Sequence, residues 1–65
     1  MSLPLAPFER IVKKAGAKRV SANAVEELRD IIEEYGLEIA KKAWNIAQHA
    51  GRRTVQKKDI KFVVQ

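Results

Sequence analysis

Basic side chains are the groups of this chain best suited to binding chemistry, and they gather towards its two ends. The sequence carries 13 lysine and arginine residues against 8 acidic residues, which gives a net charge of +5. Residues 1–19 contain five basic side chains and one acid, residues 20–40 one and six, and residues 41–65 seven and one. Two basic regions that flank an acidic one indicate a polyanionic partner, although a generally solvated surface remains the alternative.

The sequence offers little for catalysis. It contains a single histidine, His49, and no cysteine, and its carboxylates mostly follow one long helical stretch. An enzyme needs a nucleophile, a base or a metal site inside a pocket, and one histidine cannot hold a metal ion alone. We therefore predict that the protein is not an enzyme and that it uses neither a metal ion nor a cofactor. Without cysteine there is also no disulfide framework.

The hydrophobic pattern predicts an all-α chain of three helices that forms one domain over residues 1–65. Pro7 suits the first turn of the first helix, and Gly16 suits its end. Between these two residues, apolar side chains recur on one helical face. They are Phe8, Ile11, Val12 and Ala15.

Residues 22–50 form the longest predicted helix, with Ser21 as its N-cap and Gly51 at its end. A helix of these 29 residues is roughly 43 Å long, whereas a compact globule of this chain length is only about 28 Å across. Because the helix is apolar at both ends, it needs a second chain to cover it, and we predict an obligate dimer. The expected dimer core steps along the helix by three or four residues: Leu28, Ile32, Tyr35, Ile39 and Ala43.

Three other residues of the long helix allow two interpretations each. Gly36 lies near its middle, where glycine costs about 1 kcal/mol, and marks either a close crossing of two helices or a tolerated local defect. Tyr35 and Trp44 lie on the apolar stripe, so we expect them in the core and not as stacking platforms for bases.

The last predicted helix covers residues 57–64. Gln56 is a poor N-cap, so we expect this helix to depend on tertiary contacts. Ile60, Val63 and Val64 should face inward, whereas Phe62 lies off that face. An apolar residue outside the core face suggests a second interface.

The sequence does not indicate a membrane protein. It contains no run of 18 apolar residues, and its start lacks the basic and apolar regions of a signal peptide. A basic peptide that lies on a membrane surface is disfavoured by the acidic long helix. We therefore expect a cytoplasmic protein without a membrane partner.

A short, a long and a short helix make up the plan of the histone fold, and four stretches resemble archaeal histones in particular. These are residues 3–7 (LPLAP), 15–21 (AGAKRVS), 49–55 (HAGRRTV) and 58–60 (KDI). The resemblance extends over the whole chain. It implies a "handshake" dimer in which the long helices cross and the first loop of one chain lies beside the second loop of the other. It also implies that the dimer bends double-stranded DNA along its inward-facing minor grooves.

The resemblance assigns DNA contacts to both loops and to the first helix. Arg19 corresponds to a minor-groove arginine, and Arg10 to the arginine of a central site. Arg53 can reach a phosphate, and Thr54 offers a hydroxyl. Helix-surface lysines are common in any protein, which is the alternative for the lysines in this set. The full set is Arg10, Lys13, Lys14, Arg19, Ser21, Arg53, Thr54 and Lys57.

The resemblance also assigns structural and assembly roles. Arg52 and Asp59 correspond to an ion pair within one chain that fixes the second loop to the last helix. Four residues correspond to a contact between dimers: Ile46, His49, Asp59 and Phe62. The bland alternative for His49 is a helix-end residue stabilised by the helix dipole. These roles imply a tetramer or larger assembly on DNA, and the family allows a heterodimer with a paralogous histone.

The function expected from these observations is that of an architectural protein that wraps and compacts double-stranded DNA on the chromosome (nucleoid), largely without sequence specificity. The alternative is a histone-fold subunit that only binds other proteins in a transcription complex. Basic residues in both loops argue against that alternative, because a pure interaction module does not need them.

Overall fold

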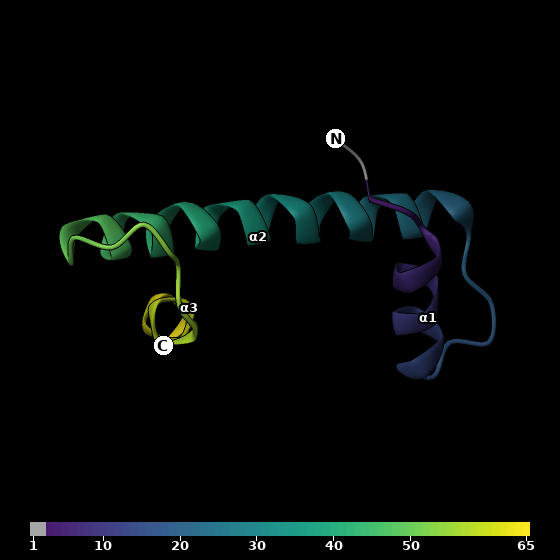
Figure 1. The fold of residues 1–65 in the computed structure, drawn as a ribbon. Coiled ribbons are helices and arrows are strands. Elements are labelled where there is room, and N and C mark those ends of the chain that lie inside the picture. The colour runs from purple at the N-terminus through teal and green to yellow at the C-terminus, as the bar shows by residue number, and fades with distance from the viewer. Residues whose placement is uncertain (1–2) are drawn as a thin grey trace. The chain divides into compact units, whose positions relative to one another are not determined.

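The computed structural model describes residues 3–65, which contain three α-helices and no strand (Figure 1). Helix α1 spans Ala6–Lys14, α2 spans Ala22–His49 and α3 spans Lys57–Val64. The predicted all-α plan of a short, a long and a short helix is therefore confirmed. The range predicted for the last helix matches α3, and α2 ends one residue earlier than expected.

Both loops begin with the same glycine-based helix stop. Gly16 has a φ of 117° and Gly51 a φ of 74°, which is a region that favours glycine. After α1, the amide of Gly16 donates to the carbonyl of Lys13 and that of Ala17 to Val12. After α2, Gly51 donates to Gln48, and Arg52 to Ala47. These paired bonds define Schellman motifs, which satisfy the last carbonyls of each helix.

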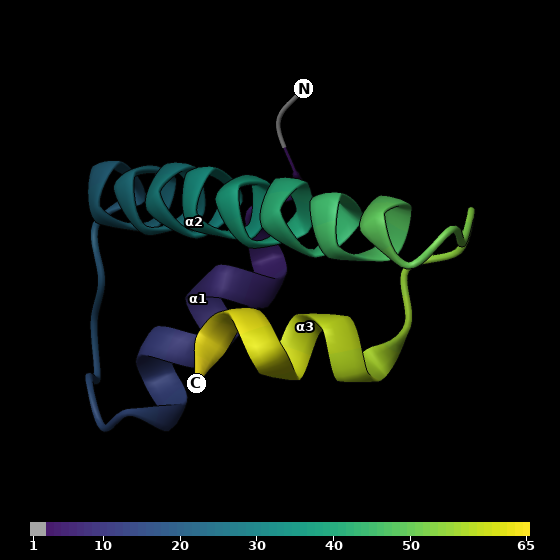
Figure 2. The ribbon, with the colours of Figure 1, turned by 90° about the vertical axis from the view of Figure 1, so that its left-hand side faces the viewer.

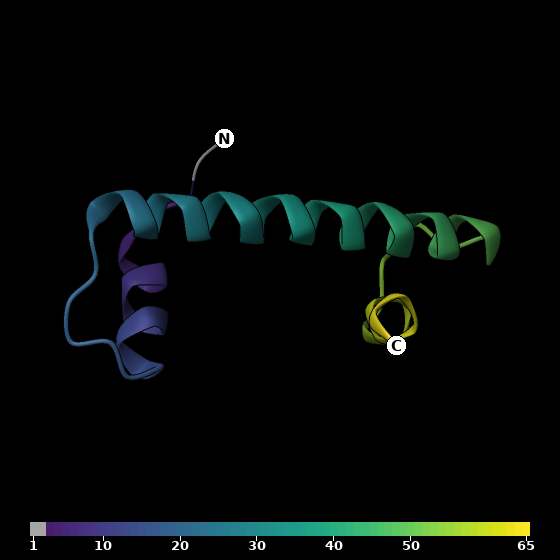
Figure 3. The ribbon, with the colours of Figure 1, turned by 180° about the vertical axis from the view of Figure 1, so that it is seen from behind.

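The chain divides into two compact units, and the first ends at Glu34. In this unit α1 lies beside the first part of α2 (Figures 1 and 3). Its buried apolar residues are Phe8 on α1 and Val25 on α2, while Val12 and Leu28 are half-buried. Ile11, although it lies on the predicted apolar face of α1, is 49% exposed.

The second unit begins at Tyr35 and contains α3 and the last part of α2 (Figure 2). Its fully buried apolar residues are Ala43 and Ala47. Ile60 and Val64 are 37% and 53% exposed, and only Val63 is half-buried. The expectation that all three face inward is wrong for the single chain, because a few turns of α2 cannot cover every apolar side chain of α3.

Large apolar side chains remain exposed along all three helices. They include two of the predicted dimer-core residues, Ile32 and Tyr35, whereas Leu28 and Ile39 are half-buried and Ala43 is already covered within its own unit. The full set is Leu3, Ile11, Ile31, Ile32, Tyr35, Leu37, Trp44, Val55, Ile60, Phe62 and Val64. Within the described residues, no helix is both long enough and apolar enough to span a membrane.

If a second copy covers this surface, unfolding must include dissociation, so the urea midpoint should rise with protein concentration. Trp44 is 40% exposed in the single chain, and its fluorescence should report its burial in the dimer. Urea titrations over a hundredfold range of concentration provide the measurement. A midpoint that stays constant over this range is the result that contradicts the dimer.

Candidate nucleic-acid interface

The first loop, residues 15–21, presents Lys18 and Arg19 between two fixed ends. The Schellman motif holds its start, and at its end the hydroxyl of Ser21 accepts a hydrogen bond of 3.2 Å from the amide of Ala24. This bond caps α2, as the sequence predicts. Val20 is half-buried, while Lys18 and Arg19 are exposed. The loop therefore holds two cations close together in a short, restrained segment.

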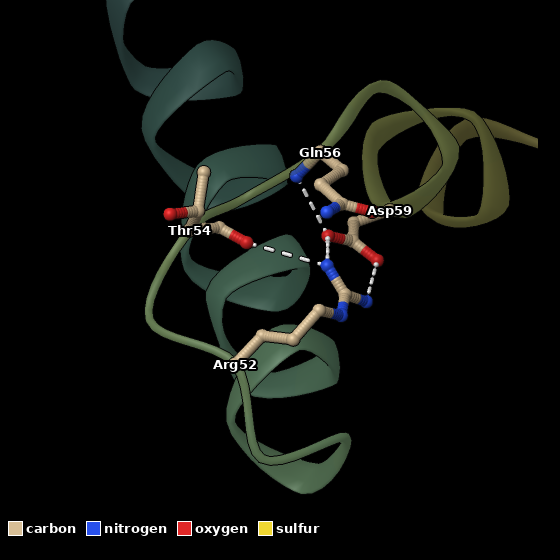
Figure 4. Close-up of polar contacts among 4 residues, drawn as sticks. All are labelled: Arg52, Thr54, Gln56 and Asp59. Carbon is tan, nitrogen blue, oxygen red and sulfur yellow. Dashed lines mark hydrogen bonds and ion pairs between the residues drawn. The ribbon is translucent and has the colours of Figure 1, made fainter.

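The second loop, residues 50–56, is organised by a bidentate ion pair (Figure 4). The two terminal nitrogens of Arg52 donate to the two carboxylate oxygens of Asp59 at 2.9 and 2.8 Å. Arg52 also donates to the carbonyl oxygen of Thr54 at 3.3 Å. Because Arg52 closes the loop on itself in this way, its charge is engaged within the chain.

Asp59 is the most constrained polar residue in the described part of the chain, with 2% of its surface exposed. Besides Arg52, its carboxylate accepts a hydrogen bond of 2.8 Å from the amide of Gln56. The hydrogen bond from Arg52 and that from the Gln56 amide lower the pKa of Asp59 to about 2. The same pair raises the pKa of Arg52 above its ordinary value. Both groups therefore stay ionised under ordinary conditions.

The bond between Asp59 and Gln56 corrects one expectation. We expected α3 to lack a cap and to depend on tertiary contacts, but Asp59 in its first turn satisfies the Gln56 amide. This is one half of a capping box, in which an acid three residues after the N-cap reaches back to it. The spacing Gln56-x-x-Asp59 was the available signal, and the sequence interpretation assigned Asp59 only to the ion pair and the dimer contact.

The remaining side chains of the second loop are accessible. Arg53 and Thr54 are exposed, and Figure 4 shows the Thr54 hydroxyl pointing away from the ion pair. Lys57 follows directly in the first turn of α3 and is exposed too. Restrained by Arg52 and Asp59, this loop offers Arg53 and Lys57 as cations within five residues of one another.

Helix α1 adds basic groups to the first unit. Arg10 and Lys14 are exposed and form no ion pair among the described residues. Lys13 lies 3.1 Å from Glu9, but both side chains are about half exposed. Exposed pairs with this spacing are worth only about 0.3–0.5 kcal/mol, so Lys13 can exchange Glu9 for a phosphate at little cost.

The predicted DNA-binding residues thus fall into two groups, one in each unit. The first group contains the α1 cations with Arg19 and Ser21, and the second contains Arg53, Thr54 and Lys57. Lys18 was not among the predicted contacts, although its exposure and its position beside Arg19 place it with the first group. Its signal in the sequence was the adjacent pair of cations in a short loop.

The residues predicted to join dimers differ in accessibility. Phe62 is 70% exposed, His49 is exposed, Ile46 is half-buried and Asp59 is buried. An open groove of about 350 Å³ in the second unit is lined by Lys42, Asn45, Ile46, Phe62 and Val63. Within residues 3–65, no cluster of three histidine or carboxylate side chains could hold a metal ion.

Comparison with known proteins places this geometry in a family context. Residues 1–64 match the family described as histone-like transcription factor (CBF/NF-Y) and archaeal histone. The chain is 48% identical over 63 residues to the archaeal histone HAN1 of Thermococcus zilligii, and the match covers 97% of this chain and 94% of that protein. It is 51% identical over 63 residues, with the same coverage, to probable archaeal histone 3 of Methanocaldococcus jannaschii.

A more distant relative is histone H4 of Dictyostelium discoideum. It is 29% identical over 58 residues, which make up 89% of this chain and 54% of that protein. The archaeal relatives match along nearly their whole length, and so the resemblance inferred from the loop motifs is confirmed.

The lowered pKa of Asp59 predicts a pH-dependent stability. Because its pKa in the folded protein is about 2 against an ordinary 3.8, the carboxylate stabilises the fold above pH 4 and loses this effect as the pH falls towards 2. We expect Asp59→Asn to be clearly less stable than the parent at pH 7, and the difference to vanish near pH 2. Denaturation curves at pH 7, 4 and 2 measure it. Glu34→Gln, the same change at an exposed position, is the control, and an equal loss in both variants contradicts the prediction.

Proposed function

Because the chain belongs to the family of histone-like transcription factors (CBF/NF-Y) and archaeal histones, we propose that it is an architectural protein that binds and compacts double-stranded DNA as a dimer. The observation that carries this proposal is the pair of restrained loops. Each begins with a Schellman glycine, and each presents exposed cations beyond it, Lys18 and Arg19 in one and Arg53 in the other.

Binding of this kind rests on phosphate neutralisation. Lysine and arginine side chains displace the counterions of DNA, and this gain does not depend on the base sequence. The proposed phosphate contacts are Arg10, Lys13, Lys14, Arg53 and Lys57, with Ser21 and Thr54 as hydroxyl donors. Arg19 would enter the minor groove, whose narrow form attracts arginine. Few base contacts are proposed, so DNA deformability would set any sequence preference.

The dimer supplies the second half of this surface. We propose that the exposed α2 residues Ile32 and Tyr35 pack against a second copy in a handshake arrangement, together with Leu28, Ile39 and Ala43. Trp44, exposed in the single chain, would be covered in the same way. The atoms of the chain itself leave open space around Gly36, which is compatible with a helix of the partner crossing there.

Assembly beyond the dimer is proposed from the groove of the second unit. Phe62, at 70% exposure, is the most exposed large apolar residue of the described chain, and with Ile46 it lines the groove. A second dimer that inserts its own Phe62 would bury both side chains and bring His49 towards Asp59. Such contacts would align dimers along DNA, as expected of a protein associated with the chromosome in the cytoplasm. A paralogous histone could replace one copy of the chain.

The alternative function, a histone-fold subunit that binds only proteins in a transcription complex, is less well supported. The family description includes such transcription factors, but both relatives near 50% identity are named as archaeal histones. The exposed arginines of the two loops also lack a role in that alternative.

DNA binding should depend steeply on salt. If a dimer neutralises about 8 phosphates, the logarithm of its affinity should fall against the logarithm of salt concentration with a slope near −7. Arg53→Ala should flatten this slope by nearly 2, because a dimer carries the residue twice. Arg19→Ala should weaken binding as well. Fluorescence titrations of a short duplex at several salt concentrations give the slope.

Lys41→Ala provides a matched control, since Lys41 is an exposed lysine on α2 outside the proposed contacts. It should change the slope little. A parent slope of −2 or shallower would favour the protein-interaction alternative, and normal binding by both arginine variants would refute the loop assignment.

The assembly contact can be separated from DNA binding. His49→Ala should leave the dimer folded and its binding to short duplexes nearly unchanged, because His49 lies outside the proposed DNA contacts. It should lose the longer fragments that nuclease digestion yields when dimers join side by side. Ile46→Asp is the stronger variant, since it places a charge in an apolar contact. An unchanged ladder of protected lengths in His49→Ala returns His49 to a plain helix-end residue.

A further inference from the structure

Helix α1 begins without a side-chain cap. Its N-cap residue, Leu5, makes no capping hydrogen bond, and the helix has only nine residues. Isolated helices shorter than about 12–15 residues are marginal in water, so the start of α1 needs support from elsewhere. Leu5 is half-buried and the side chain of Leu3 is 45% exposed, which makes burial of this segment only a partial anchor.

Two side chains of α2 hold the backbone of Leu3 from both sides. The Leu3 amide donates to a carboxylate oxygen of Glu33, and the Leu3 carbonyl oxygen accepts a hydrogen bond of 3.4 Å from Arg29. Arg29 and Glu33 are four residues apart, so both lie on one face of α2. Figures 1 and 3 show the segment before α1 passing across this part of α2.

Arg29 is poorly placed to be a DNA contact itself. It is the only basic residue between positions 20 and 40, yet its side chain is just 16% exposed. Its guanidinium is shared between the Leu3 carbonyl and the carboxylate of Asp30, at 3.1 Å. Glu33 is half-buried, unlike its exposed neighbour Glu34. Both partners of Leu3 are thus held within the first unit.

We propose that Arg29 and Glu33 form a clamp on Leu3 that fixes where α1 begins and thereby orients its cations, Arg10 above all, towards DNA. They are positioning residues, because they act through α1 without touching the nucleic acid. This proposal rests on the DNA-binding function proposed above. Its distinctive consequence is that a carboxylate, Glu33, strengthens the binding of a polyanion.

The clamp itself can be tested without DNA and without a variant. In the parent dimer, the Leu3 amide should exchange with solvent at least tenfold more slowly than in an unstructured peptide, as measured by NMR hydrogen exchange. Glu33→Gln keeps an oxygen acceptor and should preserve most of this protection, whereas Glu33→Ala should remove it. A Leu3 amide that is unprotected in the parent overturns the clamp.

The effect on DNA is best measured as a comparison of neighbours. Glu33→Ala and Glu34→Ala remove the same charge from the same helix, but only Glu33 holds Leu3. Glu34→Ala should bind a short duplex as well as the parent or slightly better, because it removes a repelling charge. Glu33→Ala should bind about fivefold more weakly, which corresponds to about 1 kcal/mol. Equal or tighter binding by Glu33→Ala overturns the positioning role.

A double-mutant cycle shows whether the clamp acts through α1. In an Arg10→Ala background, the loss caused by Glu33→Ala should largely disappear, because the residue that it orients is gone. In an Arg53→Ala background the loss should persist, since Arg53 belongs to the other unit. A loss that is equal in both backgrounds contradicts action through Arg10.

The two proposals fail in different ways. If the parent itself shows no salt-dependent DNA binding, the proposed function is wrong, and exchange of the Leu3 amide still decides whether the clamp exists. If the parent binds DNA and Glu33→Ala matches Glu34→Ala, only the positioning role is wrong.

Discussion

The scarcity of buried apolar surface is the constraint on which the rest of this structure depends. Four apolar residues of the described chain are buried, and two of them are alanines. Ordering the backbone costs about 1–2 kcal/mol per residue, which so small a core cannot offset. The side chains that could offset it, among them Ile31, Leu37 and Trp44, are exposed along α2. The stability of the fold and the surface that it offers to DNA are therefore both properties of an assembly of chains.

With little core to hold them, the loops are restrained by local bonds. Each loop has seven residues, and in each the glycine of the Schellman motif precedes the N-cap of the next helix by five positions. The caps differ in chemistry. Ser21 uses its own hydroxyl, whereas the cap at Gln56 is supplied from within α3 by Asp59, which Arg52 holds in place. The second loop therefore relies on a charged network where the first relies on one neutral hydrogen bond.

The sequence predicted what depends on neighbouring residues. Helical spacing, Gly16 and Gly51 as stops and Ser21 as a cap were sufficient to locate all three helices, because each signal acts within a few residues. The exposure of Ile60 and Val64 was not predicted, since a hydrophobic pattern does not tell whether a side chain packs in its own chain or in another. The contacts of Leu3 with Arg29 and Glu33 bridge 26 and 30 positions and leave no periodic trace. The DNA contacts came from family resemblance alone.

Net charge overstates how many cations are free to meet phosphate. Arg29 and Arg52 are engaged by carboxylates and backbone carbonyls, and Lys13 is shared with Glu9. These engaged cations still bear on binding, because a loop or helix that is already ordered loses less conformational entropy when it meets its partner. Arg52 illustrates the distinction: it spends its charge inside the second loop, and by doing so it holds Arg53 in a segment that is already shaped. The availability of each basic residue is therefore decided by its local partners, and the engaged ones contribute by keeping the free ones in place.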